Sequence, residues 1–173
     1  LFEAIQQWVG HWPGGLGLSA LLSCGIFSAI SGSSVATAAT VATVAIPEMQ
    51  KRGYDRGFTL GLLAAGGTLG ILIPPSIPLI VYGVITDESI GKLFMAGVGP
   101  GILLIVLFGI YTVYHAWKTK LHRLEKSANS RQKWGATLRA LPTILLAVLI
   151  IGGIYAGAFT PTEASAVGAF AAF

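Results

Sequence analysis

The side chains that usually carry out chemistry are few in this sequence, and they are not grouped. His11, His115 and His122 fall near the ends of apolar segments, with no carboxylate or cysteine at metal-ligand spacing from them. The phosphate-binding pattern G-x-x-x-x-G-K-[ST] is absent, so this stretch carries no ATPase machinery. We therefore expect no enzyme, no catalytic residue and no cofactor.

Two polar breaks inside apolar segments remain as places where an ion could bind. One is Ser31–Ser34, and the other runs from Gly66 to Ser76 and contains Pro74 and Pro75. Broken helices expose N–H groups at half-helix starts, which favour carboxylates, and carbonyls at half-helix ends, which coordinate Na⁺ together with hydroxyls. The alternative is that small residues only let helices pack closely; we favour an ion or substrate site.

The overall composition indicates that the elements carrying these breaks lie in a lipid bilayer. Apolar residues make up 54% of the chain and charged residues 10%, whereas a soluble domain carries roughly a quarter charged residues. The 23 glycines and 8 prolines are tolerated in membrane helices because neighbouring helices satisfy the freed backbone groups. We expect an all-α polytopic membrane protein.

The first break lies in an uncharged run over residues 14–46. This run is longer than the roughly 20 residues of one spanning helix, yet too short for two spans and a turn. We predict a re-entrant helical hairpin with its polar turn at Ser31–Ser34. The alternative is one long tilted helix whose serines bond to the preceding turn.

The second break lies in an uncharged segment over residues 58–84. Proline cannot donate a backbone hydrogen bond, and the residue before proline avoids helical angles. The doubled Pro74-Pro75 therefore predicts a discontinuous transmembrane helix, with helical hydrogen bonding lost between Gly70 and Ser76. A plain proline kink is the alternative.

The remaining segments follow from apolar length and charge. We expect an interfacial amphipathic helix over 1–13, a loop over 47–57, spans over 93–117 and 140–158, a basic arm over 118–139, and the start of a further helix over 160–173. Thr160-Pro161-Thr162-Glu163 is typical of a capping box at that last start. The glycine pairs Gly57/Gly61, Gly97/Gly101 and Gly153/Gly157 are assigned to helix packing.

Charge predicts how these segments are oriented. Ten of the eleven Lys and Arg residues fall in segments 47–57 and 118–139, whereas the link over 85–92 contains Asp87 and Glu88. The positive-inside rule places both basic segments in the cytoplasm and the link outside. Because spans flank the basic arm, we expect it to face lipid headgroups and not nucleic acid.

Several stretches resemble the large membrane subunit of TRAP (tripartite ATP-independent periplasmic) transporters, in the same order and over nearly the whole chain. They are Gly14–Leu16, Phe27–Ala38, Ala45–Met49, Arg52–Asp55, Gly67–Ser76 and Phe159–Ala164. The resemblance implies a multi-pass protein of the bacterial inner membrane that imports an organic acid, driven by Na⁺. It implies an elevator-type transport domain held in a scaffold, a small four-helix membrane subunit and a periplasmic substrate-binding protein. This chain would contribute one half of an inverted repeat.

The resemblance also implies that the hairpin tip and the broken span line sodium and substrate sites. The positions concerned are Ser31, Gly32, Ser33, Ser34, Gly67, Thr68, Gly70, Pro74, Pro75 and Ser76.

The cost of unsatisfied backbone groups in hydrocarbon leads us to predict that the two breaks approach each other and share one Na⁺ site. Its oxygens would be carbonyls near Ser31, Gly32 and Gly67 and the hydroxyls of Ser33, Ser34 and Thr68. Two other functions stay open on sequence alone. One is a divalent-anion/Na⁺ symporter without a binding protein, and the other is a structural or assembly protein of the membrane.

Overall fold

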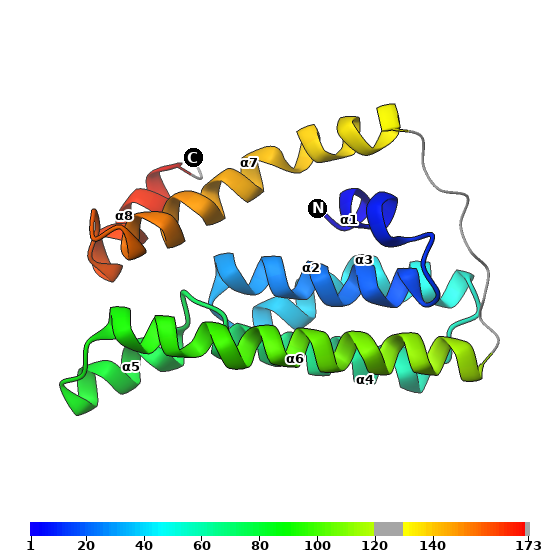
Figure 1. The fold of residues 1–173 in the computed structure, drawn as a ribbon, viewed down its shortest axis with the longest axis horizontal. Coiled ribbons are helices and arrows are strands. Elements are labelled where there is room, and N and C mark those ends of the chain that lie inside the picture. The colour runs from blue at the N-terminus through cyan, green and yellow to red at the C-terminus, as the bar shows by residue number, and fades with distance from the viewer. Residues whose placement is uncertain (120–129, 172–173) are drawn as a thin grey trace.

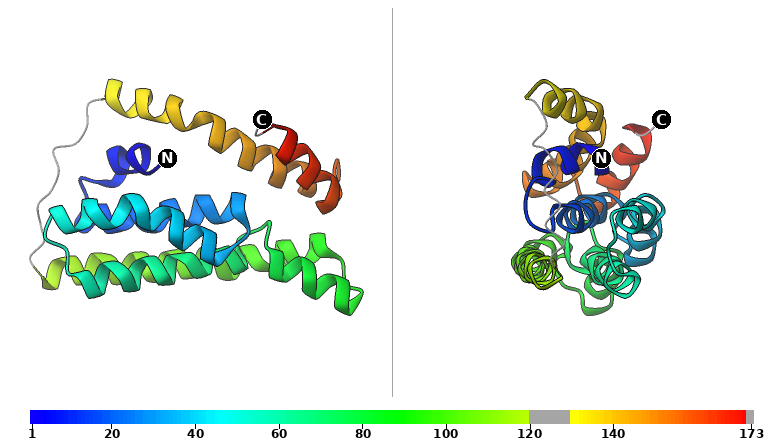
Figure 2. Two further views of the ribbon diagram at one scale, coloured as in Figure 1. Left: turned by 180° about the vertical axis from the view of Figure 1, so that it is seen from behind. Right: turned by 90° about the vertical axis from the view of Figure 1, so that its right-hand side faces the viewer.

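The computed structural model describes residues 1–119 and 130–171, and every regular element in them is an α-helix. The helices are α1 (Phe2–Val9), α2 (Gly15–Ser31), α3 (Ser34–Lys51), α4 (Arg56–Leu72), α5 (Ile77–Thr86), α6 (Ile90–Lys118), α7 (Ser130–Tyr155) and α8 (Pro161–Ala171). Figure 1 shows α2 and α3 lying along α4 and α6, with α1 and α7 on the other side of α2. The end-on view in Figure 2 places α2 and α3 between the α4–α6 pair and α7. Parts of the expected basic arm (120–129) and of the last helix (172–173) lie outside the described residues.

The hairpin breaks where the sequence predicts its turn. Helix α2 ends at Ser31, Gly32 adopts a left-handed conformation, and α3 begins at Ser34. The alternative of one long tilted helix is therefore wrong. With 17 and 18 residues, the two arms are about 26 Å long, whereas the 29 residues of α6 span about 44 Å. The hairpin thus turns back part-way along α6, as a re-entrant hairpin would; its placement in a bilayer stays a prediction.

The discontinuous helix is also found. Ile73 donates the last hydrogen bond of α4, to the carbonyl of Leu69 at 2.8 Å, and α5 begins only at Ile77. Between them lie Pro74 and Pro75, which have no N–H to donate. The predicted loss of helical hydrogen bonding between Gly70 and Ser76 is confirmed.

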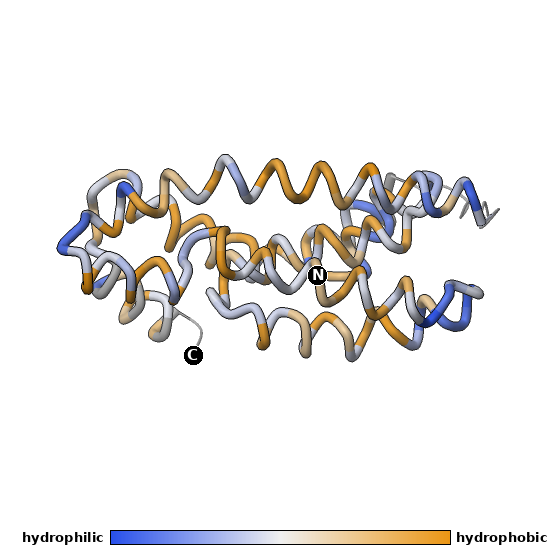
Figure 3. Tube along the Cα trace, turned by 90° about the horizontal axis from the view of Figure 1, so that it is seen from below, coloured by the Kyte–Doolittle hydropathy of each residue, from blue (hydrophilic) through white to orange (hydrophobic). Residues whose placement is uncertain are grey.

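In the part of the chain that the structure describes, three helical stretches are long and apolar enough to cross a membrane. They are Arg56–Thr86, which includes the break, Ile90–Lys118 and Lys133–Tyr155. Figure 3 shows the hydrophilic residues gathered toward the two ends of these elements, with apolar residues along their middle. The exposed side of α6 carries large aliphatic residues such as Leu103, Val106 and Leu107, which suits contact with lipid. The chain is a multi-pass membrane protein.

Two helices extend further than the sequence indicates. A loop is expected over 47–57, but α3 continues through Pro47 to Lys51, and the connection to α4 is only Arg52–Asp55. The helix holds there because Met49 is fully buried in the core and Arg52 donates to Glu48 at 2.9 Å one turn earlier. Likewise, α7 begins ten residues before the expected span at 140.

The N-terminal helix α1 is shorter than the expected 1–13 and ends at Val9. Its apolar side is buried through Phe2 and Ala4, and Ala4 packs against Ala136 and Ala140 of α7. On its exposed side the Trp8 indole N–H donates to the Thr137 hydroxyl at 3.0 Å. These contacts explain why α7 is already helical there.

The glycine pairs differ in what they contact. If Gly97 carried a Cβ atom, that atom would overlap the carbonyl of Leu72, and a Cβ atom on Gly101 would lie 3.1 Å from the Ile73 side chain. The absence of side chains at these two glycines therefore lets α6 lie close to the end of α4. In contrast, nothing lies within 4 Å of such an atom at Gly61. The packing role is confirmed for Gly97/Gly101, and among the described residues Gly61 has no such role.

The predicted capping box at the start of α8 is confirmed. The Thr160 N–H donates to Glu163 Oε2 at 2.8 Å, and the Glu163 N–H donates to Thr160 Oγ1 at 3.3 Å. The bonds from the backbone and then the hydroxyl of Thr160 lower the pKa of Glu163. Capping thus accounts for this carboxylate without a functional role.

Replacing Gly32 with alanine is expected to destabilise the protein. The left-handed conformation costs a non-glycine residue about 1–2 kcal/mol, and the new methyl group would overlap the carbonyl oxygen of Pro75. We expect Gly32→Ala to lower the free energy of unfolding of the complete chain in detergent by about 2 kcal/mol or more.

Gly61→Ala is the matched control, because Gly61 lies inside α4 and faces open space. Alanine there should be neutral or should stabilise the helix by up to about 1 kcal/mol. Similar losses in both variants would show that the Gly32 backbone is not constrained as described.

Candidate functional site

The hairpin tip is shaped by one glycine and one serine. The N–H of Gly32 donates to the backbone carbonyl of Ser28 at 3.0 Å and so forms the last hydrogen bond of α2. Ser33 is extended, and its hydroxyl accepts a hydrogen bond from the N–H of Ala36 at 3.3 Å. Ser33 is therefore the N-cap of α3, the role for which serine is favoured. The tip presents the carbonyl end of α2 beside the N–H end of α3.

A cluster of hydroxyl groups lies just inside the tip. The hydroxyls of Ser31 and Thr37 are 3.0 Å apart, and the Ser28 hydroxyl donates to that of Thr37 at 3.4 Å. The Ser33 N–H also donates to the Ser31 hydroxyl, at 3.3 Å. Ser28 and Thr37 are completely buried. This cluster links the two arms of the hairpin with oxygen atoms that can donate or accept.

Ser28 and Thr37 were not among the residues predicted for the site. The signal that could have found them is their spacing. Ser28 lies three residues before Ser31, and Thr37 lies three residues after Ser34, so each is one helical turn from the break. In an antiparallel hairpin these two positions face each other.

The break between α4 and α5 ends on a buried serine. Ser76 precedes the first residue of α5, and its hydroxyl donates to the carbonyl of Ile71 at 2.5 Å. The Ser76 side chain is completely buried. In a continuous helix the carbonyl of Ile71 would accept a hydrogen bond from the N–H of residue 75, but Pro75 has no N–H. The Ser76 hydroxyl supplies the missing donor.

The two breaks meet through their backbones. The Ile77 N–H, at the start of α5, donates to the carbonyl of Gly32 in the hairpin tip at 3.2 Å. A Cβ atom at Gly70 would lie 2.9 Å from the Ser33 carbonyl oxygen, and one at Gly67 would lie 3.0 Å from that of Ser34. The prediction that the two breaks approach each other is confirmed. We call this meeting point, formed by residues 31–34 and 73–77, the crossing.

Four helix ends converge at the crossing. Helices α2 and α4 end there, and α3 and α5 begin there. Helix ends carry partial negative charge on their carbonyls, and helix starts carry partial positive charge on their N–H groups. The residues of the crossing have no charged side chain. The carbonyl ends of α2 and α4 and the N–H ends of α3 and α5 thus lie in one small region.

The structure does not bring all of the predicted residues to the same side. Thr68 is exposed, and its hydroxyl donates to the carbonyl of Ala65 on its own helix at 2.6 Å. The glycines on either side, Gly67 and Gly70, face the hairpin, which leaves Thr68 on a different face of α4. Pro74 borders an apolar cavity instead of the hydroxyl cluster.

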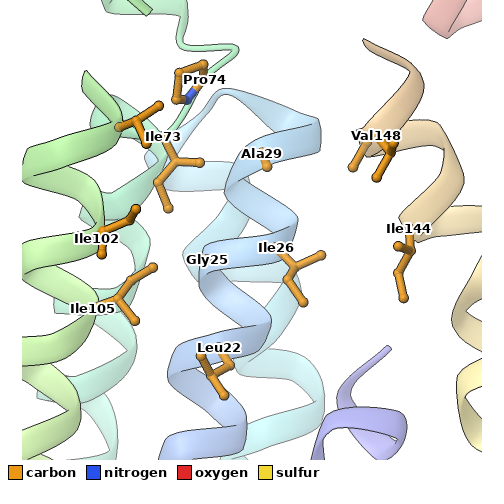
Figure 4. A pocket seen from close by; sticks show the side chains of 12 residues that line it. Leu22, Gly25, Ile26, Ala29, Ile73, Pro74, Ile102, Ile105, Ile144 and Val148 are labelled. Carbon is orange, nitrogen blue, oxygen red and sulfur yellow. The ribbon is translucent and has the colours of Figure 1, made fainter. Parts of the chain in front are cut away.

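That apolar cavity has a volume of about 420 Å³ and lies beside the crossing (Figure 4). It is lined by Leu22, Gly25, Ile26, Ala29, Ile73, Pro74, Val98, Ile102, Ile105, Ile144, Ala147 and Val148. None of these side chains is polar, so the lining offers nothing to a charged substrate.

The two histidines that the structure describes, His11 and His115, belong to no metal site. His115 stacks flat on Phe58 with ring centroids 3.9 Å apart, and His11 makes an edge contact with Trp12. His122 lies outside the described residues. Within residues 1–119 and 130–171, no group of three or more His, Cys, Asp or Glu side chains could hold a metal ion.

Comparison with known proteins points to one family. The family described as "Tripartite ATP-independent periplasmic transporter, DctM component" matches residues 1–173. The chain is 49% identical, over 98% of its length, to the C4-dicarboxylate TRAP transporter large permease protein of Pseudomonas aeruginosa. It is 45% identical, over 95% of its length, to the protein of that name from Rhodobacter capsulatus. It is 42% identical, over 96% of its length, to the ectoine TRAP transporter large permease protein of Halomonas elongata.

These relatives are considerably longer than the chain. The matched region covers 39% of the Pseudomonas protein, 40% of the Rhodobacter protein and 39% of the Halomonas protein. The chain thus spans about two fifths of the length of the curated relatives it matches.

Because of the hydroxyl cluster, we expect replacement of two threonines of α3 to have very different effects on the free energy of unfolding. Thr37→Val keeps the shape of the side chain but removes the partner of the Ser28 and Ser31 hydroxyls. We expect the free energy of unfolding in detergent to fall by about 1–3 kcal/mol, the cost of leaving buried polar groups unpaired.

Thr43→Val on the same helix is the control. Thr43 is exposed, and its hydroxyl bonds only to the carbonyl of Thr40. Its replacement should change stability by no more than about 0.5 kcal/mol. Equal effects of the two substitutions would mean that the cluster does not hold the arms together.

Proposed function

Because the chain belongs to the family of tripartite ATP-independent periplasmic transporters, as a DctM component, we propose that it forms part of a permease importing an organic acid by Na⁺-coupled secondary transport. The family is one of transport permeases and not of enzymes. The matched relatives include permeases named for C4-dicarboxylate and for ectoine. The organic acid is therefore proposed as a class, without a single named member.

The observation that carries this proposal is the crossing of the two broken elements. The hydrogen bond from the Ile77 N–H to the Gly32 carbonyl brings two half-helix ends and two half-helix starts together. Secondary transporters build substrate and ion sites from such discontinuous helices, with N–H ends toward anions and carbonyl ends toward Na⁺. A packing role alone would not require buried hydroxyls at the same point.

We place the coupling ion between the hairpin side of the crossing and the neighbouring Gly67 of α4, held by oxygens alone. Na⁺ needs about five or six oxygen ligands, in line with the preference of hard cations for oxygen. The carbonyls near Ser31, Gly32 and Gly67 and the hydroxyls of Ser33 and Ser34 are the proposed ligands. Thr68, whose hydroxyl bonds to its own helix on another face, is left out of this set.

Neutrality of the site gives the coupling its physical basis. With no carboxylate at the crossing, a bound Na⁺ leaves a net positive charge beside the N–H ends of α3 and α5. That charge attracts an anionic substrate, and the substrate in turn strengthens Na⁺ binding, as linkage requires. An organic acid is the substrate class that benefits from this arrangement.

The proposed partners and location follow from the family. We propose that the protein works in the bacterial inner membrane with a small four-helix membrane subunit and a periplasmic substrate-binding protein. The tripartite, periplasmic description of the family supports this over a symporter that needs no binding protein. The basic ends of α3 and α7 would face the cytoplasm, and Asp87 and Glu88 would face the periplasm.

The test compares Ser33 with Thr68 in the complete transporter. Ser33→Ala should raise the Na⁺ concentration for half-maximal uptake by about tenfold, because losing one charge-assisted contact costs about 1.5 kcal/mol. Ser33→Thr, which keeps the hydroxyl, and Thr68→Ala should retain the wild-type response. The measurement is uptake of labelled substrate into proteoliposomes at graded Na⁺ concentrations.

Ser33 also caps α3, so its replacement by alanine should cost about 1 kcal/mol of stability. Thermal unfolding of the same preparations separates the two effects. A stability loss in Ser33→Ala with unchanged Na⁺ dependence would refute the proposed ligand. An equal shift in Thr68→Ala would place the ion on a different face of α4.

A further inference from the structure

The start of α5 is capped by another element. Its N-cap residue is Ser76, but the Ser76 hydroxyl donates to the carbonyl of Ile71, so no side chain caps α5 in the part of the chain that the structure describes. The first N–H of α5, that of Ile77, instead donates to the carbonyl of Gly32 at 3.2 Å. Pro78 follows and has no N–H. The hairpin tip therefore serves as the cap of α5.

Helix α3 also begins at the crossing, but its cap is its own. The Ser33 hydroxyl accepts from the N–H of Ala36 at 3.3 Å, as a serine N-cap does. The two helix starts therefore differ. The start of α3 depends on a side chain beside it, whereas the start of α5 depends on a single carbonyl of the hairpin.

The carbonyl of Gly32 is also one of the proposed ligands of Na⁺. An N–H directs the positive end of its dipole at this oxygen, and Na⁺ directs a full positive charge at it. Two positive groups on one oxygen repel each other strongly where the effective dielectric constant is low. The N–O distance of 3.2 Å lies at the long end of the range for such hydrogen bonds, so the N–H is the weaker competitor.

Building on the proposed function, we infer that Na⁺ displaces the Ile77 N–H from the Gly32 carbonyl. Binding of the ion breaks the hydrogen bond between the hairpin tip and α5 and releases the N–H into the site. A backbone N–H at membrane depth must find another acceptor, and an anionic oxygen forms the stronger kind of hydrogen bond with it. The ion thereby creates a demand for an anion at the crossing, which gives the proposed coupling an atomic form.

Amide hydrogen exchange measures the state of this N–H directly. Residues 74–78 include three prolines, so a peptide of that span carries only the amides of Ser76 and Ile77, which fragmentation in the mass spectrometer separates. The complete transporter in detergent is compared in Na⁺ and in choline at equal ionic strength. We expect Na⁺ to speed exchange at Ile77 by about tenfold, the effect of losing one hydrogen bond, and to slow exchange at residues 31–36.

Replacement of Ile77 by its α-hydroxy acid analogue supplies the second arm. The resulting ester keeps the shape of the backbone but removes the competing donor. Binding of radioactive Na⁺ should become about three to ten times tighter, the range expected when one hydrogen bond no longer opposes the ion. The matched control is the same replacement at Ile90, which is likewise the first residue of its helix, α6, and lies beyond the far end of α5. The control should leave Na⁺ affinity unchanged.

The outcomes separate the displacement from the Na⁺ site itself. Absence of Na⁺ binding by the wild-type transporter would contradict the proposed function, and the displacement with it. If Na⁺ binds and slows exchange at residues 31–36 but does not speed exchange at Ile77, the carbonyl holds both groups and the displacement alone is wrong. Unchanged or weaker Na⁺ binding by the folded Ile77 ester would also overturn it. If the ester variant does not fold, the wild-type exchange at Ile77 decides.

Discussion

The architecture depends on one constraint, that backbone polar groups inside a bilayer must find partners within the protein. Each break would be costly alone, because helix ends leave N–H and carbonyl groups without intrahelical partners. The crossing relieves this cost for both elements together. The Gly32 carbonyl accepts from the Ile77 N–H, Ser33 caps α3, and the Ser76 hydroxyl reaches the carbonyl of Ile71. The first of these bonds joins the two breaks, whereas the other two act within the hairpin and within the α4–α5 break.

Close approach of the backbones is possible only because glycines stand at the contact. On α4, Gly67 and Gly70 leave no room for a side chain against the hairpin, and Gly66 lies against Cys24 of α2 in the same way. Gly97 and Gly101 bring α6 to the end of α4 from the other side. Helices α2, α4 and α6 therefore form one tightly packed body around the crossing, whereas α7 borders the apolar cavity.

The crossing separates two chemical environments that meet at its backbone. Toward the hairpin interior are the hydroxyls of Ser28, Ser31 and Thr37. Toward α7 are Ile73 and Pro74, which belong to a wall without polar side chains. An ion held by carbonyls and hydroxyls would thus be shielded from the hydrocarbon by the proline side of the break. Because charges interact more strongly at a low effective dielectric constant, the proposed Na⁺ would act more strongly on an anionic substrate here than it would in water.

Local chemistry in the sequence determined where the two elements break and where α8 begins. Glycine at the tip, the paired prolines and the Thr160–Glu163 box act through the backbone of neighbouring residues, and the spans follow from apolar length; all of these were predicted. Only the tertiary structure decided which face each residue presents. Thr68 points away from the hairpin, Ser28 and Thr37 join the hydroxyl cluster, α3 continues past Pro47 because Met49 is buried, and the cavity arises between three helices. The face that Thr68 presents, the burial of Met49 and the cavity depend on how the helices pack together, which no local pattern records. The spacing of Ser28 and Thr37 from the break is the one local signal among these features.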